Sequence, residues 1–274
     1  MRLLGSNLRK LRRRPATWVT FILLVALLLL VLLAVVVGSQ EARSPQAALG
    51  ARLFVTFPGA YELILAMVLG IGGLLAVTYG AAVAGSEWTW GTLKAAIARG
   101  ESRSRYTIAG FGAVAIFACI GLVLAFLVGV AGAAVGATII GVSLSGMGDG
   151  ETLGRMPELF ARAGLAVSMN AAFGYAIATI ARSQLAGIGV GIGLFFAEGI
   201  AGIFLPDVIK WFPFASSSAV VAVSDGAAAG MGGGGGGGLG ASLDPNTAVL
   251  ATLAWLVASV LVASLWTERA EIGG

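Results

Sequence analysis

The sequence predicts an all-α integral membrane protein with six transmembrane helices, an amphipathic interfacial helix at the N-terminus and a short polar helix after the second span. Of its 274 residues, 58% are hydrophobic and 11% are charged, whereas soluble domains carry about 25% charged residues. Six apolar runs approach or exceed the length needed to cross a hydrocarbon core of roughly 30 Å. Basic residues gather beside these runs rather than in a separate domain.

The composition excludes several function classes. There is no histidine, which removes histidine-based zinc sites, Ser-His and Cys-His catalysis and haem ligation. No GxxxxGK[ST] motif occurs, so the chain is not expected to bind ATP through a phosphate loop. The single cysteine, Cys119, cannot form an internal disulfide. The net charge of +4 is better explained by orientation in the membrane than by nucleic acid. We expect no metal, no cofactor and no covalent chemistry on this chain.

Residues 1–14 are predicted to form an amphipathic helix on an anionic leaflet. Leu4, Leu8 and Leu11 follow the spacing i, i+4, i+7 and are accompanied by six basic residues, a pattern typical of interfacial helices. Pro15 ends the helix and turns the chain into the bilayer. The alternative is a basic flank of the first span with no helix of its own.

The predicted spans make residues 1–274 a single transmembrane domain. The first is too long for the apolar core of a signal peptide, so it is expected to remain as an anchor. The six spans are expected at 18–37, 61–84, 106–135, 158–181, 184–205 and 247–266.

The segments between the spans are predicted from their proline, glycine and polar content. Loops are expected at 38–60 and 141–157, and only Arg182 and Ser183 separate the fourth and fifth spans. Residues 206–246 are expected to be a long extracytoplasmic loop that contains the glycine run 232–238. That run is interpreted as a flexible linker and not as a phosphate cradle, because no strand, lysine or helix start follows it.

The distribution of Lys and Arg predicts that both termini are cytoplasmic. With the N-terminus inside, twelve basic residues fall on the inner side and five on the outer side, as the positive-inside rule requires. The inner residues are Arg2, Arg9, Lys10, Arg12, Arg13, Arg14, Lys94, Arg99, Arg103, Arg105, Arg182 and Arg269; the outer ones are Arg43, Arg52, Arg155, Arg162 and Lys210.

The polar segment 86–98 between the second and third spans is predicted to be a short cytoplasmic helix. Trp90, Leu93 and Ile97 fall on one helical face, and tryptophans are common anchors in protein interfaces. The alternative is an ordinary juxtamembrane helix whose tryptophans lie among lipid headgroups. The candidate contact residues are Glu87, Trp88, Trp90, Gly91, Thr92, Leu93, Lys94 and Arg99.

This segment resembles a motif of the permease subunits of type-2 ABC transporters, which reads Glu-x-x-x-Gly-Thr-Leu-Lys before an Arg- and Ser-containing turn. The matching residues are Glu87, Gly91, Thr92, Leu93, Lys94, Arg99, Ser102 and Arg103. The layout of basic N-terminal helix, six spans and long outer segment before the last span is also similar. So is the aromatic-proline stretch 211–214.

The resemblance implies a division of labour between subunits. The chain would pair with a second permease copy, or a related permease, in a prokaryotic-type plasma membrane. Two copies of a cytosolic ABC ATPase would bind ATP and Mg²⁺ and dock on 86–98, the coupling helix. The similar permeases include drug, lipid and polysaccharide exporters, so an exporter is expected, and the apolar path without a ring of charges favours a hydrophobic or lipid-like substrate.

Two polar residues lie within predicted spans, Asn170 in the fourth and Glu198 in the fifth. Measured from the short turn between these spans, both lie at a similar depth, about 18 and 21 Å from it. We expect Asn170 to hydrogen-bond Glu198 as the neutral acid. This pair is interpreted as a structural clasp between helices, with a substrate or proton contact as the alternative.

Two other function classes compete with an ABC permease. A secondary transporter would use Glu198 as its ion or proton site, and a non-transporting anchor or assembly protein would need no site at all. An intramembrane enzyme is disfavoured because the chain has neither histidine nor paired aspartates within its spans.

Overall fold

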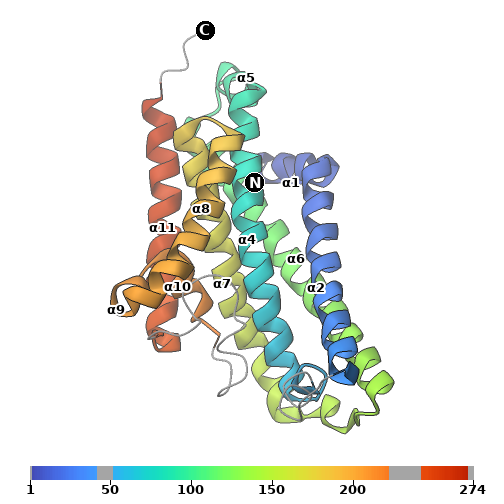
Figure 1. Cartoon of the computed structure of the whole chain (residues 1–274). Helices are drawn as coiled ribbons and strands as arrows, with labels where there is room; N and C mark the ends of the chain where they lie inside the picture. Colours follow the sequence, from blue (N-terminus) through green and yellow to red (C-terminus); the bar gives the residue numbers. More distant parts are fainter. Residues whose placement is uncertain (1, 42–51, 222–241, 271–274) are drawn as a thin grey trace.

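The computed structural model describes residues 2–41, 52–221 and 242–270, and every regular element there is a helix (Figure 1). The glycine run 232–238 and residues 42–51 of the first loop lie outside the described residues. Within the described ranges, six helices are long and apolar enough to cross a membrane, which confirms the all-α membrane fold. They are α2 (Pro15–Glu41), α4 (Gly59–Thr89), α6 (Arg103–Ile140), α7 (Gly150–Ala181), α8 (Gln184–Phe204) and α11 (Pro245–Arg269).

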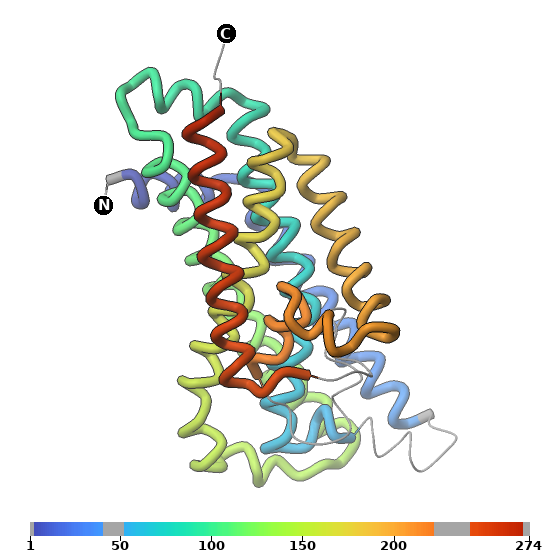
Figure 2. The backbone as a smooth tube through the Cα atoms, turned by 90° about the vertical axis from the view of Figure 1, so that its left-hand side faces the viewer, coloured from blue at the N-terminus to red at the C-terminus, as the bar shows by residue number. Residues whose placement is uncertain are grey.

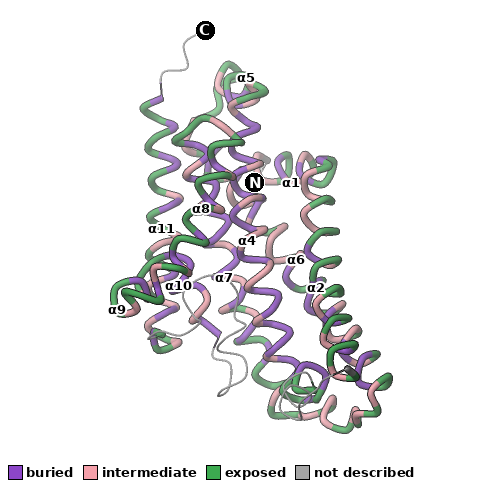
Figure 3. Tube along the Cα trace, viewed as in Figure 1, coloured by how far each residue is buried: buried purple, intermediate pink, exposed green. Residues whose placement is uncertain are grey.

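Helices α4 and α7 form the centre of the bundle, as their burial in Figure 3 shows. The apolar window of each is 67% buried, against 22% for that of α2. Their backbones touch at two glycines. A Cβ on Gly80 would lie 2.0 Å from the carbonyl oxygen of Ala171, and one on Gly174 would lie 2.0 Å from that of Val77. Small residues permit such close packing between helices in lipid, where dispersion contacts replace the hydrophobic driving force.

The remaining spans surround this pair. Helices α2, α6 and α8 contact α4, while α6, α8 and α11 contact α7. Arg182 takes a left-handed conformation (φ 50°) and ends α7, and the Ser183 hydroxyl accepts a hydrogen bond from Ala186 N at the start of α8. A serine at this position satisfies an N–H group that the helix itself leaves unpaired.

Helix α7 begins at Gly150, well before the expected start of the fourth span at 158. The Asp149 carboxylate accepts hydrogen bonds from the backbone and hydroxyl of Thr152, and these bonds lower the pKa of Asp149. Pro157 therefore lies inside the helix rather than in a loop. The interval after α6 is reduced to a few residues around the 3₁₀ turn η1 (Ser145–Gly148).

The segment after α8 is not a simple loop. It contains α9 (Pro206–Ile209) and α10 (Pro213–Ser218), and most residues of α10 are buried. Figure 2 shows both short helices between the neighbouring ends of α8 and α11. The chain thus folds back into the bundle, which requires polar partners for its backbone at that depth.

Helix α1 (Arg2–Arg13) lies crosswise at the end of the bundle that carries α5 (Thr92–Ala98), here called the α5 end (Figure 1). The apolar side of this helix packs on protein. Leu11 is 1% exposed, and Leu4 and Leu8 lie against the same core. The exposed basic residues of α1 are Arg9, Arg12 and Arg13.

The C-terminal end of α11 reaches the α5 end as well. Arg103, at the first turn of α6, donates hydrogen bonds from Nη1 to the carbonyl oxygens of Glu268 (3.0 Å) and Ala270 (2.8 Å). An Arg side chain here satisfies carbonyl groups that the end of a helix leaves unpaired. Both ends of the described chain therefore lie at the same end of the bundle (Figure 1).

Candidate functional site

The candidate site is the junction where α4 passes into α5. Helix α4 continues to Thr89, and Gly91 then takes a left-handed conformation (φ 64°) before α5 begins at Thr92. Glycine adopts this backbone conformation without the steric cost that a side chain brings. The expected single helix over 86–98 is therefore two helices with a turn between them. Trp90 lies in the turn and does not share a helical face with Leu93.

A buried carboxylate holds this junction together. Glu87, on the last turn of α4, is 6% exposed. Its Oε2 accepts hydrogen bonds from Thr92 Oγ1 at 2.5 Å and from Tyr106 Oη at 2.6 Å. These bonds connect the end of α4 to the start of α5 and to the first turn of α6. One side chain thus fixes the geometry of the whole turn.

Two cations from α1 and its C-terminal flank complete this cluster. Lys10 Nζ lies 2.7 Å from Glu87 Oε1, and Arg14 Nη2 lies 2.8 Å from the same oxygen. Arg14 also donates to Ser86 Oγ at 2.7 Å. Burial lowers the pKa of Lys10, while its ion pair with Glu87 acts in the opposite direction. The pair of cations and one carboxylate ties the N-terminal segment to the α4–α5 junction.

Apolar contacts fix α5 to the same place. Leu93 (4% exposed) and Ala96 (1% exposed) pack against Tyr106, with Leu3 of α1 beside them. Trp88 is half-buried and its ring lies under the guanidinium of Arg182, 5.2 Å away. A cation over an indole ring is attracted by the ring quadrupole. Helix α5 is therefore a packed part of the α5 end and not a free arm.

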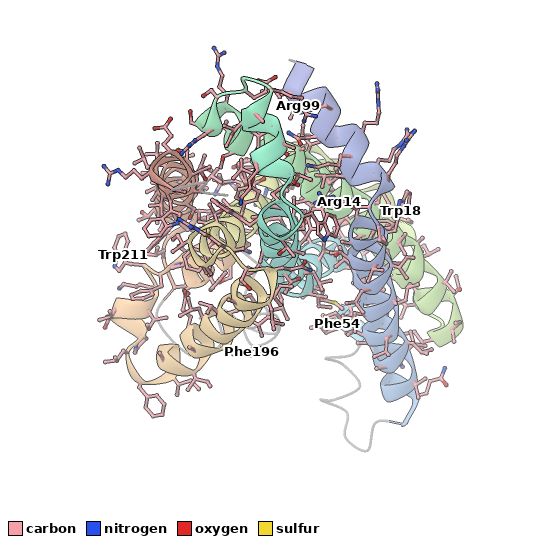
Figure 4. The ribbon with its side chains drawn as sticks, turned by 90° about the horizontal axis from the view of Figure 1, so that it is seen from above. Arg14, Trp18, Phe54, Arg99, Phe196 and Trp211 are labelled. Carbon is pink, nitrogen blue, oxygen red and sulfur yellow. The ribbon has the colours of Figure 1, made fainter. Side chains whose placement is uncertain are left out.

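The predicted contact residues divide into three groups by exposure. Glu87 and Leu93 point into the protein, and Trp88, Gly91 and Thr92 are half-buried. Trp90 is 63% exposed, with the Arg14 guanidinium 5.0 Å from its ring centre. Lys94 and Arg99 are also exposed. Figure 4, a view onto the α5 end, shows Arg99 at the outer rim and Arg14 turned towards the bundle.

Sequence reasoning missed the partners of Glu87. All six basic residues near the N-terminus were assigned to lipid headgroups, yet Lys10 and Arg14 point inwards. One signal was available, because Arg14 follows Leu11 by three residues and so continues the apolar stripe of the helix. A cation on that stripe indicates a buried partner of opposite charge.

The expected hydrogen bond between Asn170 and Glu198 is not formed, because α10 lies between their polar groups. Glu198 Oε2 accepts hydrogen bonds from the backbone N–H groups of Phe214 (3.0 Å) and Ala215 (3.1 Å). Asn170 Oδ1 accepts one from the hydroxyl of Ser217 (3.1 Å). A carboxylate suits the N–H groups at the start of a helix. Both residues therefore hold α10 inside the bundle.

We expect Glu198→Leu to release α10 and to lower the stability of the protein by about 2 kcal/mol, because two buried N–H groups lose their acceptor. Glu198→Gln keeps an acceptor oxygen and should cost clearly less. Thermal unfolding in detergent measures both. Equal losses for the two variants would contradict this role. A Glu198→Gln protein of normal stability that had lost transport would instead favour the substrate or proton contact.

The described residues contain no group of three or more Cys, Asp or Glu side chains arranged to hold a metal ion. The exposed side chains of Trp90, Lys94 and Arg99 lie in α5 or next to its ends. The buried side of α5 contacts residues of α1, α4 and α6.

Comparison with known proteins agrees with this geometry. Residues 3–198 match the family described as ABC-2 family transporter protein, and that interval runs from α1 through the α4–α5 junction to Glu198. No match is found among curated proteins. The match covers well over half of the 274 residues. The chain therefore belongs to the ABC-2 family of transporter proteins, the multi-pass membrane components of ABC transport systems.

Proposed function

We propose that this chain is the permease subunit of an ATP-driven exporter and that α5 is its coupling helix. Family membership implies an ABC ATPase partner in general. The observation that carries the finer proposal is the exposed surface of Trp90, Lys94 and Arg99, called the α5 surface below, above the buried Glu87 cluster. Tryptophan and basic side chains are frequent anchors in interfaces, and no lipid-facing role would require Glu87 beneath them.

In this proposal, two cytosolic ATPase subunits bind ATP and Mg²⁺ and engage the α5 surfaces of two permease copies, identical or related. Closure of the ATPase dimer displaces α5. Since Leu93, Ala96 and Glu87 bind α5 to α1, α4 and α6, the displacement passes into the spans as a rigid-body change between two states. Both termini would then face the cytoplasm of a prokaryotic-type plasma membrane.

A hydrophobic or lipid-like substrate is part of the same proposal. It is supported by the roles of the two intramembrane polar residues, since Asn170 and Glu198 are engaged with α10. Side chains that hold the fold in this way leave few polar groups for a hydrophilic substrate. The same engagement removes the main reason for a secondary transporter built on Glu198.

We expect Trp90→Ala/Lys94→Ala to weaken capture of an ABC ATPase from detergent extracts by about thirtyfold, the effect of losing about 2 kcal/mol at an interface anchor. The matched control is Trp211→Ala, which removes an exposed tryptophan between α9 and α10, away from the α5 end. Leu93→Ala is unsuitable as a contact variant, because Leu93 is buried and its truncation lowers stability.

Three outcomes would contradict the proposal. The first is equal capture of the ATPase by the wild type and by Trp90→Ala/Lys94→Ala. The second is no ATPase bound to the wild type under conditions that preserve other ABC complexes of the same host. Loss of capture in both the double variant and Trp211→Ala would show a general defect and would also reject α5 as the specific contact.

A further inference from the structure

A cavity of about 140 Å³ lies between α2, α4 and α6 on the side of the bundle near α1. Its walls are almost entirely apolar and include Trp18 and Leu24 of α2, Leu75 of α4 and Phe117 and Gly121 of α6. An apolar cavity of about 150 Å³ in a protein core is large enough to take up benzene. This space therefore has the size and chemistry for a short length of hydrocarbon.

The cavity exists because α2 and α6 touch along only part of their length. Far from α1, Leu32 and Val36 of α2 pack on Gly132 and Gly136 of α6. The contact is so close that a Cβ added to either glycine would lie nearer to these side chains than an ordinary van der Waals contact allows. Nearer to α1, this contact is lost, and a Cβ on Gly121 would meet no atom within 4 Å. Helix α1 bridges the two helices at this end, since it contacts both α2 and α6.

The hydroxyl groups of Thr17 and Tyr79, at the α1 end of the cavity, are already engaged with protein atoms. Thr17 Oγ1 hydrogen-bonds the carbonyl oxygen of Leu11 (2.8 Å) and lies 3.0 Å from Tyr79 Oη. The occupant therefore does not need polar groups inside. Ile120 and Leu124 of α6 line both this cavity and a shallow groove on the outer side of α6. A long, flexible, apolar occupant fits this shape.

The mouth of the cavity lies beside positive charge. Trp18 is 55% exposed at the mouth, and its Nε1 donates to the carbonyl oxygen of Arg12 (2.9 Å). Arg9, Arg12 and Arg13 are exposed on α1, whereas Lys10 and Arg14 are both paired with Glu87. An indole at this level is typical of the boundary between hydrocarbon and headgroups. The exposed arginines of α1 therefore place positive charge at the level of the lipid headgroups.

We propose that this cavity binds one acyl chain of an anionic phospholipid whose headgroup phosphate pairs with the exposed arginines of α1. The acyl chain enters from the membrane between α2 and α6 below α1. Arg side chains bind phosphate in a bidentate manner, and basic residues at a membrane surface favour anionic lipids. The lipid lies against the same helix that Glu87 ties to α5, so its presence stabilises α1 in this position.

The test uses the full chain in phosphatidylcholine vesicles that contain a trace of phosphatidylglycerol with a photoactivatable group in one acyl chain. Adducts are expected on residues 17–24 of α2 and 117–124 of α6. Gly121→Phe fills the cavity and should reduce this labelling at least about tenfold, which corresponds to about 1.4 kcal/mol of affinity. Ala131→Phe adds the same bulk to an exposed position of α6 and should leave the labelling unchanged.

The headgroup half of the proposal is tested with Arg9→Gln/Arg12→Gln/Arg13→Gln, which alters only exposed side chains. This variant should label equally with phosphatidylglycerol and with the corresponding phosphatidylcholine probe, whereas the wild type should prefer the former. If Gly121→Phe does not fold, the triple variant still decides. Three results would overturn the proposal. The wild type could be labelled only outside residues 17–24 and 117–124, it could show no preference for the anionic probe, or the triple variant could keep the preference of the wild type.

Discussion

Glu87→Ala is expected to destabilise the protein by about 3 kcal/mol, because removing one partner of a buried ion pair leaves the other charge without compensation. Here two cations, Lys10 and Arg14, lose the same carboxylate, and the side chain of Arg14 is only 10% exposed. Tyr106 and Thr92 lose an acceptor as well. The thermal unfolding midpoint in detergent should fall accordingly, and protease accessibility of the N-terminal segment should rise.

Two further experiments test whether the loss of stability comes from the ion pairs of Glu87. Glu101→Ala removes an exposed carboxylate shortly after α5 and should leave the midpoint within error of the wild type. In a double-mutant cycle, Glu87→Ala and Arg14→Met should cost much less together than the sum of the single changes. Additive losses would mean that Glu87 and Arg14 act independently. A midpoint for Glu87→Ala equal to that of Glu101→Ala would show that the carboxylate does not secure α1.

Gly174→Leu is expected to prevent assembly of the bundle. A Cβ at this position would stand 2.0 Å from the carbonyl oxygen of Val77, and the backbone of α4 cannot move away without disturbing the centre of the fold. Overpacking of a well-packed core costs about 1–3 kcal/mol even when side chains can adjust. A backbone contact leaves less freedom, so the yield of monodisperse protein on size exclusion should fall to near zero.

The control for this prediction lies on the same helix. Gly154 is exposed near the start of α7, and a Cβ there would meet no atom within 4 Å. Gly154→Leu should therefore give a normal yield. Gly174→Ala, the smallest change, should already lower the unfolding midpoint. Normal behaviour of Gly174→Leu would show that α4 and α7 are not in backbone contact at this level.

The six spans could be predicted from the sequence because each is a long apolar run, and hydrocarbon permits few alternatives to a helix. The Glu87–Lys94 motif was also visible from its residues. The geometry inside this motif could not be predicted, because helical periodicity carries no information on a left-handed residue such as Gly91. The sequence pattern placed Trp90 and Leu93 on one surface, whereas the turn exposes the first and buries the second.

Contacts distant in sequence were the hardest to predict. The sequence predicts that Asn170 and Glu198, two polar residues at similar depth in neighbouring spans, bond to each other. The partners come instead from α10, a six-residue helix in a segment that has the composition of a loop. A helix so short carries no usable periodicity, and its burial depends on Phe214 packing against Phe173 and Phe195. Only the assembled bundle shows this arrangement.

The long separation between Lys10 and Glu87 has a consequence for biosynthesis. The two residues are 77 positions apart, so at about 5–20 residues per second Glu87 emerges from the ribosome about 4–15 s after Lys10. During that interval the first segment carries all its positive charge without an internal partner. In the proposed orientation, with the N-terminus in the cytoplasm, these charges would hold it on the side where synthesis takes place. Glu87 would later engage two of them, so the same cations would serve first in insertion and then in the mature fold.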